Sequence, residues 1–210
     1  MAKKMSRCVI ICASPYNQPE FIKSEIRTDD YIICADGGYD IAKKASITPN
    51  LVIGDFDSSL TPVDDNIKKI ILPVEKDDTD SIYCIKYGIS KGYKSFVLLG
   101  ATGSRADHLY ANLSLLKFAY DNGCTATLKD SKTSIYYTED ILQLNCINCT
   151  VSVFPYGCSK AIVTLEGFKY SADRLVMTAD FPIGTSNIAT AESSAIKVHS
   201  GGVLVIVNYL

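Results

Sequence analysis

The stretch Ser95–Gly123, SFVLLGATGSRADHLYANLSLLKFAYDNG, contains a strand, a glycine-containing turn and a helix in one continuous segment. Its first five residues are mostly apolar on consecutive positions, which is typical of a strand buried in a parallel sheet. A helix is predicted over Ala106–Asn122, and Gly123 follows it as a helix stop. The apolar face of this helix consists of Leu109, Leu113, Leu116 and Tyr120. The stretch therefore predicts one strand–helix unit of an α/β sheet.

Strand and helix patterns alternate along the rest of the first 130 residues. A second helix is predicted over Ser81–Lys91, and a third helix is expected to open at Gly37 and Gly38. The alternation of strands with helices implies a parallel sheet with right-handed crossovers. The other predicted strands are Cys8–Ala13, Tyr31–Ala35, Leu51–Gly54, Ile70–Leu72 and Thr125–Lys129.

After about Ser131 the sequence pattern changes to short strands separated by Gly, Pro and other turn residues. Such a pattern, with almost no helical periodicity, favours an antiparallel sandwich or barrel. We therefore expect an α/β domain over residues 1–132 and an all-β sandwich domain over residues 133–210. The strands predicted in the second domain are Ile135–Tyr137, Ile141–Leu144, Thr150–Phe154, Ala161–Leu165, Gly184–Ala189, Ile196–Ser200 and Val203–Tyr209.

The composition excludes several classes of protein. The 210 residues are 47% hydrophobic with a net charge of −2, which argues against disorder and against a surface for nucleic acid or anionic membranes. No apolar run is long enough to span a membrane, and Cys8–Ala13 is too short for a secretory signal. We therefore expect a cytoplasmic protein whose 8 cysteines are reduced. The lone pair Cys146 and Cys149 is interpreted as structural, because a zinc site needs more ligands.

Aspartates follow the predicted strands or open the predicted helices. They are Asp36 in ADGG, Asp55 and Asp57 in GDFDS, Asp77, Asp78 and Asp80 in KDDTD, and Asp107 in GATGSRADH. Ligands of open α/β sheets bind at the carboxyl ends of the strands, where these carboxylates would gather. Carboxylates so close together would repel a phosphate unless divalent cations lay between them, and carboxylate oxygens are typical Mg²⁺ ligands. The pattern indicates metal-assisted chemistry on a phosphorylated substrate.

The turn GATGSRADH has the features of a phosphate-binding loop. Gly100 and Gly103 allow the backbone to approach a phosphate, and the following helix N-terminus offers free amides. Arg105 can pair with phosphate oxygens through two hydrogen bonds, and Asp107 can bind a metal or accept a proton. The alternative is an ordinary strand–helix turn capped by Ser104. KDDTD has a similar alternative, because its residues are also common at helix N-termini.

Five motifs in this order, ADGG, GDFDS, DDTD, GATGSRADH and finally GTSN in the β-rich part, resemble the thiamine pyrophosphokinase family. The resemblance covers nearly the whole chain. It implies an α/β nucleotide-binding domain followed by a β-sandwich that binds thiamine. It also implies transfer of pyrophosphate from ATP to thiamine, which yields thiamine diphosphate and AMP. Family members need Mg²⁺ and are homodimers with thiamine bound at the subunit interface.

The resemblance also implies roles for individual residues. Asp55, Asp57 and Asp80 would bind or orient Mg²⁺–ATP, and Arg105 and Asp107 would lie beside the transferred phosphates. The other candidates for binding ATP or thiamine are Asp36, Gly37, Gly100, Thr102, Gly103, His108, Tyr170, Ser186 and Asn187. From the residues alone, Ser186 and Asn187 can equally form a plain β-turn.

The chain departs from the family pattern at two positions. Ser104 occupies a position where a second glycine is common. The chain has no tryptophan, whereas relatives often have one near Tyr170. Either Tyr170 stacks on the thiamine ring in its place, or the stacking is lost.

The residues leave two other functions open. A phosphatase of the haloacid dehalogenase type would use an Asp-x-Asp motif resembling DFDSS, with a nucleophilic aspartate. That motif normally ends the first strand, whereas here it follows the third predicted strand. A non-enzymatic protein that only binds a nucleotide or thiamine is the second alternative, and the intact acidic positions argue against it.

Overall fold

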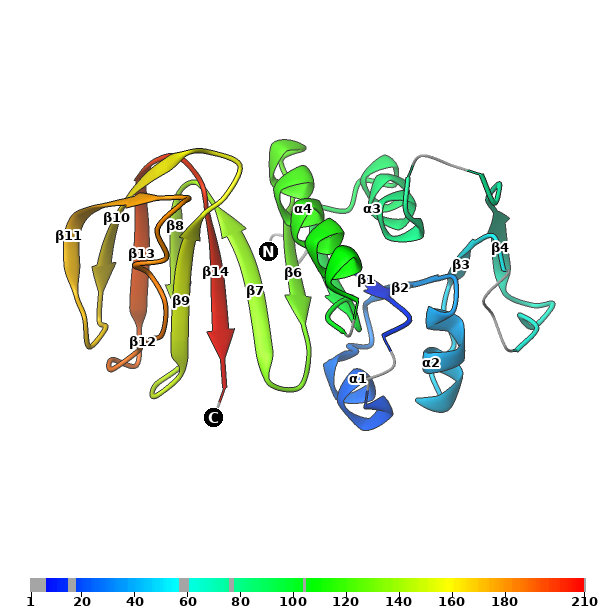
Figure 1. Cartoon of the computed structure of the whole chain (residues 1–210). Helices are drawn as coiled ribbons and strands as arrows, with labels where there is room; N and C mark the ends of the chain where they lie inside the picture. Colours follow the sequence, from blue (N-terminus) through cyan, green and yellow to red (C-terminus); the bar gives the residue numbers. More distant parts are fainter. Residues whose placement is uncertain (1–6, 15–17, 57–60, 76–77, 104, 210) are drawn as a thin grey trace. The chain divides into compact units, whose positions relative to one another are not determined.

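The computed structural model describes residues 7–14, 18–56, 61–75, 78–103 and 105–209 (Figure 1). The chain divides into two compact units, Met1–Ser131 and Lys132–Leu210. The first unit contains all four helices of the described residues, and the strands of the second unit are connected by turns and loops.

Six parallel strands form the centre of the first unit. Their spatial order is β6-β5-β1-β2-β3-β4. The chain runs outward from β1 to β4 and then returns to place β5 on the other side of β1. The strand order therefore reverses between β1 and β5, and open α/β sheets bind their ligands at such a point. The strands are β1 (Cys8–Ile11), β2 (Tyr31–Ala35), β3 (Leu51–Gly54), β4 (Lys68–Ile71), β5 (Ser95–Leu99) and β6 (Thr125–Lys129).

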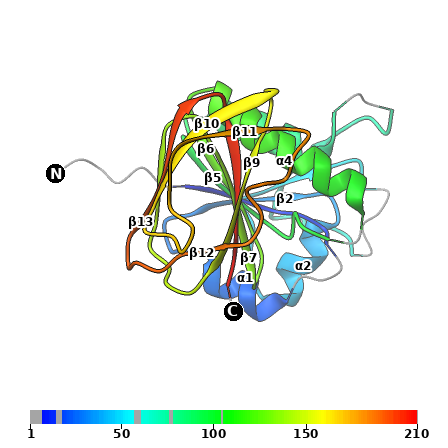
Figure 2. The same cartoon turned by 60° about the vertical axis from the view of Figure 1, so that its left-hand side comes forward.

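Two pairs of helices cover the two faces of this sheet (Figures 1 and 2). The helices are α1 (Pro19–Glu25), α2 (Gly38–Lys44), α3 (Asp80–Ser90) and α4 (Ala106–Asp121). Ile22 of α1 and Tyr39 of α2 are buried in one core cluster with Val9 and Ile11 of β1. Helix α3 contacts β1 and β2 and packs beside α4. Every residue of strands β1 and β3 is buried, because helices cover both faces of the sheet.

The parallel α/β architecture predicted for the first unit is confirmed, with shifts at the ends of elements. The first strand ends at Ile11 and not at Ala13. Strand β4 begins at Lys68 and is mostly exposed, as expected for an edge strand. Helix α1 was not predicted, because Ile22 is its only buried residue and leaves no helical periodicity in the sequence.

The second unit contains two antiparallel sheets. Their strand orders are β12-β9-β14-β7 and β11-β10-β13-β8. Alternate residues of β9, β10 and β14 belong to one buried cluster, so the two sheets pack face to face as a sandwich. The strands are β7 (Thr133–Thr138), β8 (Ile141–Leu144), β9 (Thr150–Pro155), β10 (Lys160–Glu166), β11 (Ala172–Thr178), β12 (Asn187–Ile188), β13 (Ser194–Ser200) and β14 (Val203–Asn208).

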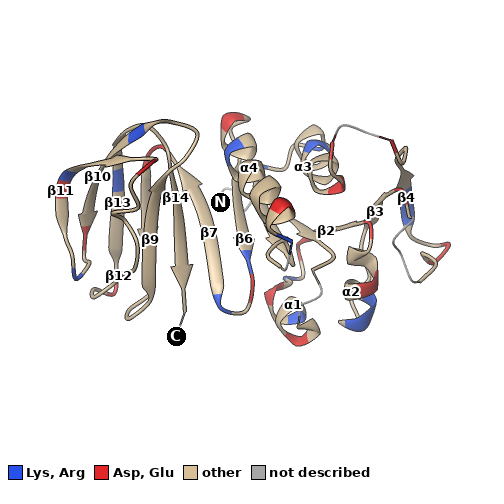
Figure 3. Cartoon of the chain, viewed as in Figure 1, with Lys and Arg blue, Asp and Glu red and all other residues tan. Residues whose placement is uncertain are grey.

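The all-β prediction for the second unit is confirmed, but two strands differ from the expectation. In the segment predicted as a strand over Gly184–Ala189, the first three residues form a turn, Asn187 and Ile188 form β12 and pair with β9, and Ala189 forms an isolated bridge with Phe168. Strand β11 was not predicted, because it is an edge strand that carries Asp173 and Arg174 and buries only Met177. Charged residues are absent from β7, β9 and β14, whereas β10, β11 and β13 each carry some (Figure 3).

Candidate functional site

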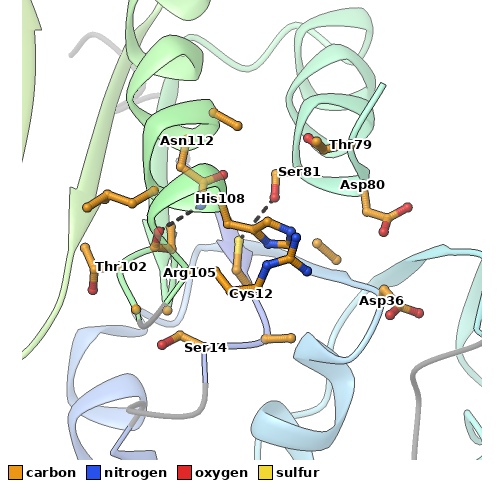
Figure 4. A pocket seen from close by; sticks show the side chains of 17 residues that line it. Cys12, Ser14, Asp36, Thr79, Asp80, Ser81, Thr102, Arg105, His108 and Asn112 are labelled. Atoms are coloured by element: carbon orange, nitrogen blue, oxygen red, sulfur yellow. Dashed lines mark hydrogen bonds between the residues drawn. The ribbon is translucent and has the colours of Figure 1, made fainter. Parts of the chain in front are cut away.

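A cavity of about 420 Å³ lies at the carboxyl ends of β1, β2 and β5, at the reversal of strand order (Figure 4). Segments that follow these three strands line it together with the N-terminal turns of α3 and α4. The lining residues are Cys12, Ala13, Ser14, Ala35, Asp36, Thr79, Asp80, Ser81, Gly100, Ala101, Thr102, Gly103, Arg105, His108, Leu109, Ala111 and Asn112. The cavity is thus acidic where β2 and α3 meet it and rich in glycine and polar groups where β5 ends.

Asp36 connects two of the acidic motifs. It is buried, its backbone lies in the left-handed region with φ of 42°, and such conformations are concentrated at functional sites. Its Oδ1 accepts a hydrogen bond of 3.2 Å from the backbone N–H of Phe56. A Cβ on Gly54 would come within 2.8 Å of the Asp36 Cα atom, so only glycine allows this approach. The loop that carries Asp55 therefore starts directly against Asp36.

The first turn of α3 places Asp80 and Ser81 at the cavity. The Ser81 hydroxyl and the Cys12 thiol form a hydrogen bond of 3.6 Å, which joins α3 to the end of β1. Burial raises the pKa of the Cys12 thiol to about 11, with a further contribution from the negative charge of Asp80. The raised pKa favours the neutral thiol form of Cys12, which is a poor nucleophile.

The loop between β5 and α4 is fixed by hydrogen bonds to neighbouring elements. Gly100 has a φ of 69°, and its carbonyl oxygen accepts from the Ser14 N–H at 3.2 Å. The Thr102 hydroxyl donates to Asp130 Oδ2 at 2.7 Å, and Asn112 Nδ2 donates to the Ala101 carbonyl oxygen at 2.8 Å. The segment Gly100–Thr102 therefore has a defined conformation, which a phosphate-binding loop requires.

Arg105 and Asp107 form a two-pronged ion pair at the mouth of the cavity. Arg105 Nε and Nη2 donate to the two carboxylate oxygens of Asp107 at 3.2 and 2.6 Å. Both side chains are 65% exposed, and Arg105 lines the cavity whereas Asp107 does not. The pair lowers the pKa of Asp107 to about 2, with help from the His108 backbone N–H, and raises the pKa of Arg105.

A second cavity, of about 190 Å³, lies in the β unit and is mostly apolar. Tyr170 is 63% exposed at this cavity, and the Lys169 ammonium lies 5.5 Å from its ring centroid. Asn187 is buried beside it and accepts a hydrogen bond from the Tyr170 N–H at 3.0 Å while donating to the Tyr170 carbonyl at 2.8 Å. The lining residues are Val151, Val153, Leu165, Phe168, Tyr170, Ser171, Ala172, Leu175, Ile183, Gly184, Thr185 and Asn187.

The predicted site residues divide between these cavities. The first cavity brings together Asp36, Asp80, Gly100, Thr102, Gly103, Arg105 and His108, and the second contains Tyr170 and Asn187. Five predicted residues that the structure describes line neither cavity: Gly37, Asp55, Asp78, Asp107 and Ser186. Asp57, Asp77 and Ser104 lie outside the described residues.

Sequence reasoning missed five polar residues of the first cavity, which are Cys12, Ser14, Thr79, Ser81 and Asn112. Cys12 and Ser14 follow the first strand, so the rule that ligands bind at strand ends could have found them. Thr79 and Ser81 lie on either side of the predicted Asp80. Asn112 is in the middle of a helix, where the sequence contains no pattern that marks it.

The described residues contain neither a ready-made cluster of metal ligands nor a helix that could cross a membrane. Within the described ranges, no three His, Cys, Asp or Glu side chains are close enough to hold a metal ion by themselves. In the same part of the chain, no helix has the length and apolar character needed to cross a membrane.

Comparisons with known proteins agree for both units. Residues 22–128 match the family model "Thiamin pyrophosphokinase, catalytic domain", and residues 139–204 match "Thiamin pyrophosphokinase, vitamin B1 binding domain". The curated thiamine pyrophosphokinase of Bacillus subtilis is 27% identical over 170 residues, which cover 76% of this chain and 79% of the relative.

Solved structures show that the fold is shared as well. The crystal structure of thiamine pyrophosphokinase from Bacillus subtilis has a TM-score of 0.88 at 21% identity and covers 98% of this chain and 100% of its own. The corresponding structure from Geobacillus thermodenitrificans has a TM-score of 0.84 at 22% identity, with 97% of each chain covered. The yeast structure has a TM-score of 0.80 at 14% identity, with 99% of this chain and 87% of its own covered.

Proposed function

Because this chain belongs to the thiamin pyrophosphokinase family, we propose that its α/β unit binds Mg²⁺–ATP and its β unit binds thiamine. The chain is a thiamine diphosphokinase, a transferase that moves pyrophosphate from ATP to thiamine. The observation that carries the assignment of the ATP site is the first cavity. It combines carboxylates, an ordered glycine-containing loop and an arginine at the reversal of strand order.

The chemistry of the first cavity fits Mg²⁺. Asp36 and Asp80 offer carboxylate oxygens at the cavity, and Asp55 begins the loop that lies against Asp36. Mg²⁺ is usually held by one or two carboxylates together with waters and substrate phosphates, so a complete protein cage is not required. We propose Asp55 and Asp80 as ligands, and Asp57 as a further ligand by its family motif. Bound there, Mg²⁺ would neutralise charge on the triphosphate.

The reaction is proposed to be an in-line attack of the thiamine hydroxyl oxygen on the β-phosphorus of ATP. A bond forms between these two atoms, the bond from the β-phosphorus to the oxygen that bridges it to the α-phosphorus breaks, and AMP leaves with that oxygen while the β- and γ-phosphates stay on thiamine. The backbone amides of the loop after β5 and the N-terminus of α4 would hold the phosphates in line. Arg105 would neutralise the charge that develops on the transferred group, because its guanidinium lines the cavity.

The ion pair changes the role that we propose for Asp107. A general base needs a pKa near the working pH, whereas the pKa of Asp107 is lowered to about 2. Its two contacts with Arg105 instead fix the direction of the guanidinium. We therefore propose that Asp107 orients Arg105, and that the hydroxyl proton leaves through another group or through water.

The second cavity suits the aromatic rings of thiamine. Its lining is mostly apolar, and the exposed ring of Tyr170 can stack on a heterocycle. Asn187 uses both ends of its amide on the Tyr170 backbone, so we propose that it holds Tyr170 in place. Ser186 donates its N–H to the Ser152 hydroxyl at 3.0 Å, so its backbone supports the turn beside the cavity.

A homodimer with the active site at the subunit interface is part of this proposal. Several large apolar side chains of the β unit are exposed near Tyr170 in sequence, among them Val176, Phe181 and Ile183. Exposed apolar side chains in such numbers are typical of surfaces that bind a partner or a ligand. A cytoplasmic location is also proposed, because all eight cysteines, each within the described residues, are free thiols.

One assay tests the proposed function. Purified protein is incubated with Mg²⁺, ATP and thiamine, and AMP and thiamine diphosphate are both quantified. Equal amounts of the two products, formed only when Mg²⁺ is present, are expected. Formation of ADP with thiamine monophosphate would contradict the proposal. Release of inorganic phosphate together with an aspartyl phosphate that can be trapped on the protein would also contradict it.

A further inference from the structure

The segment Gly100–Gly103, which follows β5, is held at three consecutive residues by three different parts of the first unit. The Ala101 carbonyl oxygen accepts from Asn112 of α4, and the Thr102 hydroxyl donates to Asp130, which follows β6. A Cβ on Gly103 would lie 2.7 Å from the Ser14 hydroxyl oxygen, so this residue packs closely on the segment after β1. The loop conformation therefore depends on contacts outside the loop itself.

Asp130 is the unexpected member of this set. It directly follows Lys129, which pairs with Leu99 in the sheet, so it lies level with the start of the loop. Unlike Thr102, it does not line the cavity. A carboxylate beside a site for a polyanion repels the ligand, since like charges at short range in a partly buried place are unfavourable. The hydrogen bond from the Thr102 hydroxyl stabilises the Asp130 carboxylate at this position in spite of the repulsion.

We propose that Asp130 is a positioning residue for pyrophosphate transfer and that it acts through the hydroxyl of Thr102. This inference rests on the proposed function, because it assigns the loop to the phosphates of ATP. A hydrogen bond from a hydroxyl to an ionised carboxylate is stronger than one between neutral groups. It fixes the Thr102 side chain at 2.7 Å from Asp130 Oδ2, and thereby the backbone on both sides of Thr102.

The expected consequence is a loss of rate without a loss of thiamine binding. Misplacement of a phosphate by about 1 Å can lower the rate on the order of 10²-fold. Thr102 directly precedes Gly103, so a shift at Thr102 should move the backbone amides of this segment. The β unit has its own core, and its cavity should stay unchanged.

The test is a double-mutant cycle with a conservative variant. The proteins are wild type, Asp130→Ala, Asp130→Asn, Thr102→Val and the double variant Thr102→Val/Asp130→Ala. For each one, kcat, the KM of thiamine and the Kd of Mg²⁺ with α,β-methylene-ATP are measured. This analogue has no cleavable bond between its α- and β-phosphorus atoms. Asp121→Ala is the matched control. Asp121 pairs with Lys117 at the C-terminal end of α4 and does not line the cavity.

Asp130→Ala and Thr102→Val should each lower kcat about 10-fold to 100-fold and weaken binding of the analogue, while the KM of thiamine stays unchanged. The double variant should be no worse than the single variants, because both remove the same hydrogen bond. Asp130→Asn keeps an acceptor oxygen and should retain kcat within about threefold of wild type. Asp121→Ala should behave as wild type.

Three results would overturn the inference. They are wild-type kcat and Kd in folded Thr102→Val, additive losses in the double variant, and an Asp130→Asn variant as impaired as Asp130→Ala. If Asp130→Ala does not fold, the inference is tested by Thr102→Val and Asp130→Asn alone: kcat should fall in the first variant and stay within about threefold of wild type in the second. If wild type forms no thiamine diphosphate, the proposed function fails, whereas the Kd values for the analogue still test the positioning role.

Discussion

The two cavities of this protein differ in the way that their side chains are held and in their chemistry. The cavity of the α/β unit is larger, at about 420 Å³ against about 190 Å³, and it is lined by carboxylates, an arginine and a hydrogen-bonded loop. The cavity of the β unit is lined mainly by aliphatic and aromatic side chains of a sandwich. The cavity of the α/β unit is suited to charged phosphates, whose positions determine the rate of phosphoryl transfer. The cavity of the β unit is suited to an aromatic ring, whose buried apolar area determines binding affinity.

This difference makes a general prediction about kinetics. Substitutions in the first cavity should lower kcat, because they remove interactions that strengthen in the transition state. Substitutions in the second cavity should raise the KM of thiamine and leave kcat nearly unchanged. The individual predictions below test this separation, beginning with the largest expected effect.

Replacing Asp80 with Asn keeps the size of the side chain but removes its charge from the first cavity. We expect kcat to fall on the order of 10²-fold or more, because a proposed Mg²⁺ ligand is lost. Product formation is measured over a range of Mg²⁺ concentrations. Asp78→Asn is the matched control, since Asp78 pairs with Lys86 and does not line the cavity. Equal activity of Asp80→Asn and wild type would remove Asp80 from the metal site.

Arg105→Lys tests the geometry of the guanidinium and not only its charge. The variant keeps the positive charge but loses the two parallel hydrogen bonds with Asp107. We expect kcat/KM for ATP to fall on the order of 10-fold, and to fall further in Arg105→Ala. The comparison is made by steady-state kinetics at saturating thiamine. A lysine variant indistinguishable from wild type would show that the two-pronged geometry is irrelevant.

Tyr170→Ala removes the exposed ring of the second cavity. Stacking of aromatic rings contributes about 0.5–1.5 kcal/mol, so the KM of thiamine should rise about 2-fold to 10-fold while the KM of ATP is unchanged. Tyr170→Phe is the control and should retain the wild-type KM of thiamine. Because Tyr170 is mostly exposed, the thermal unfolding temperature of Tyr170→Ala should stay close to that of wild type. A rise in the KM of ATP would contradict the separation of the two sites.

Asp107→Asn should have the smallest effect and should leave the shape of the pH profile intact. The pKa of Asp107 is lowered to about 2, so its charged form is favoured in the folded protein and is lost only as the pH falls towards that value. Its titration cannot produce a loss of activity between about pH 5 and pH 8. We expect a modest fall in kcat with the acidic limb of the kcat profile at the same pH. Disappearance of that limb would identify Asp107 as the base.

The α/β fold and the β-sandwich could be predicted from the sequence because their signals are local. The strands that begin at Cys8, Tyr31 and Leu51 are apolar at successive positions. Helix α4 has an apolar face, and Gly123 follows its C-terminal end. Helix α1 and strand β11 could not be predicted in this way, because each buries too few residues to leave a periodic pattern. Their formation depends on neighbours that are distant in the sequence.

The candidate site was predictable in part for a related reason. Asp36, Asp80 and Arg105 adjoin strand ends or helix starts, and topology brings these positions together. The contacts of Asn112 with Ala101 and of Asp130 with Thr102 depend on packing between elements, so no spacing in the sequence reveals them. The buried amide of Asn187 is a similar case, because its partner Tyr170 is 17 residues away.

The most direct test of the central claim is a crystal structure of the protein with Mg²⁺, α,β-methylene-ATP and thiamine. The claim is that ATP and thiamine bind to separate cavities, one in each unit. We predict that the triphosphate lies against the segment Gly100–Gly103 with Mg²⁺ near Asp80, and that the thiamine ring contacts Tyr170. A structure in which the nucleotide occupies the β-unit cavity, or in which thiamine binds without contact to that cavity, would contradict the account.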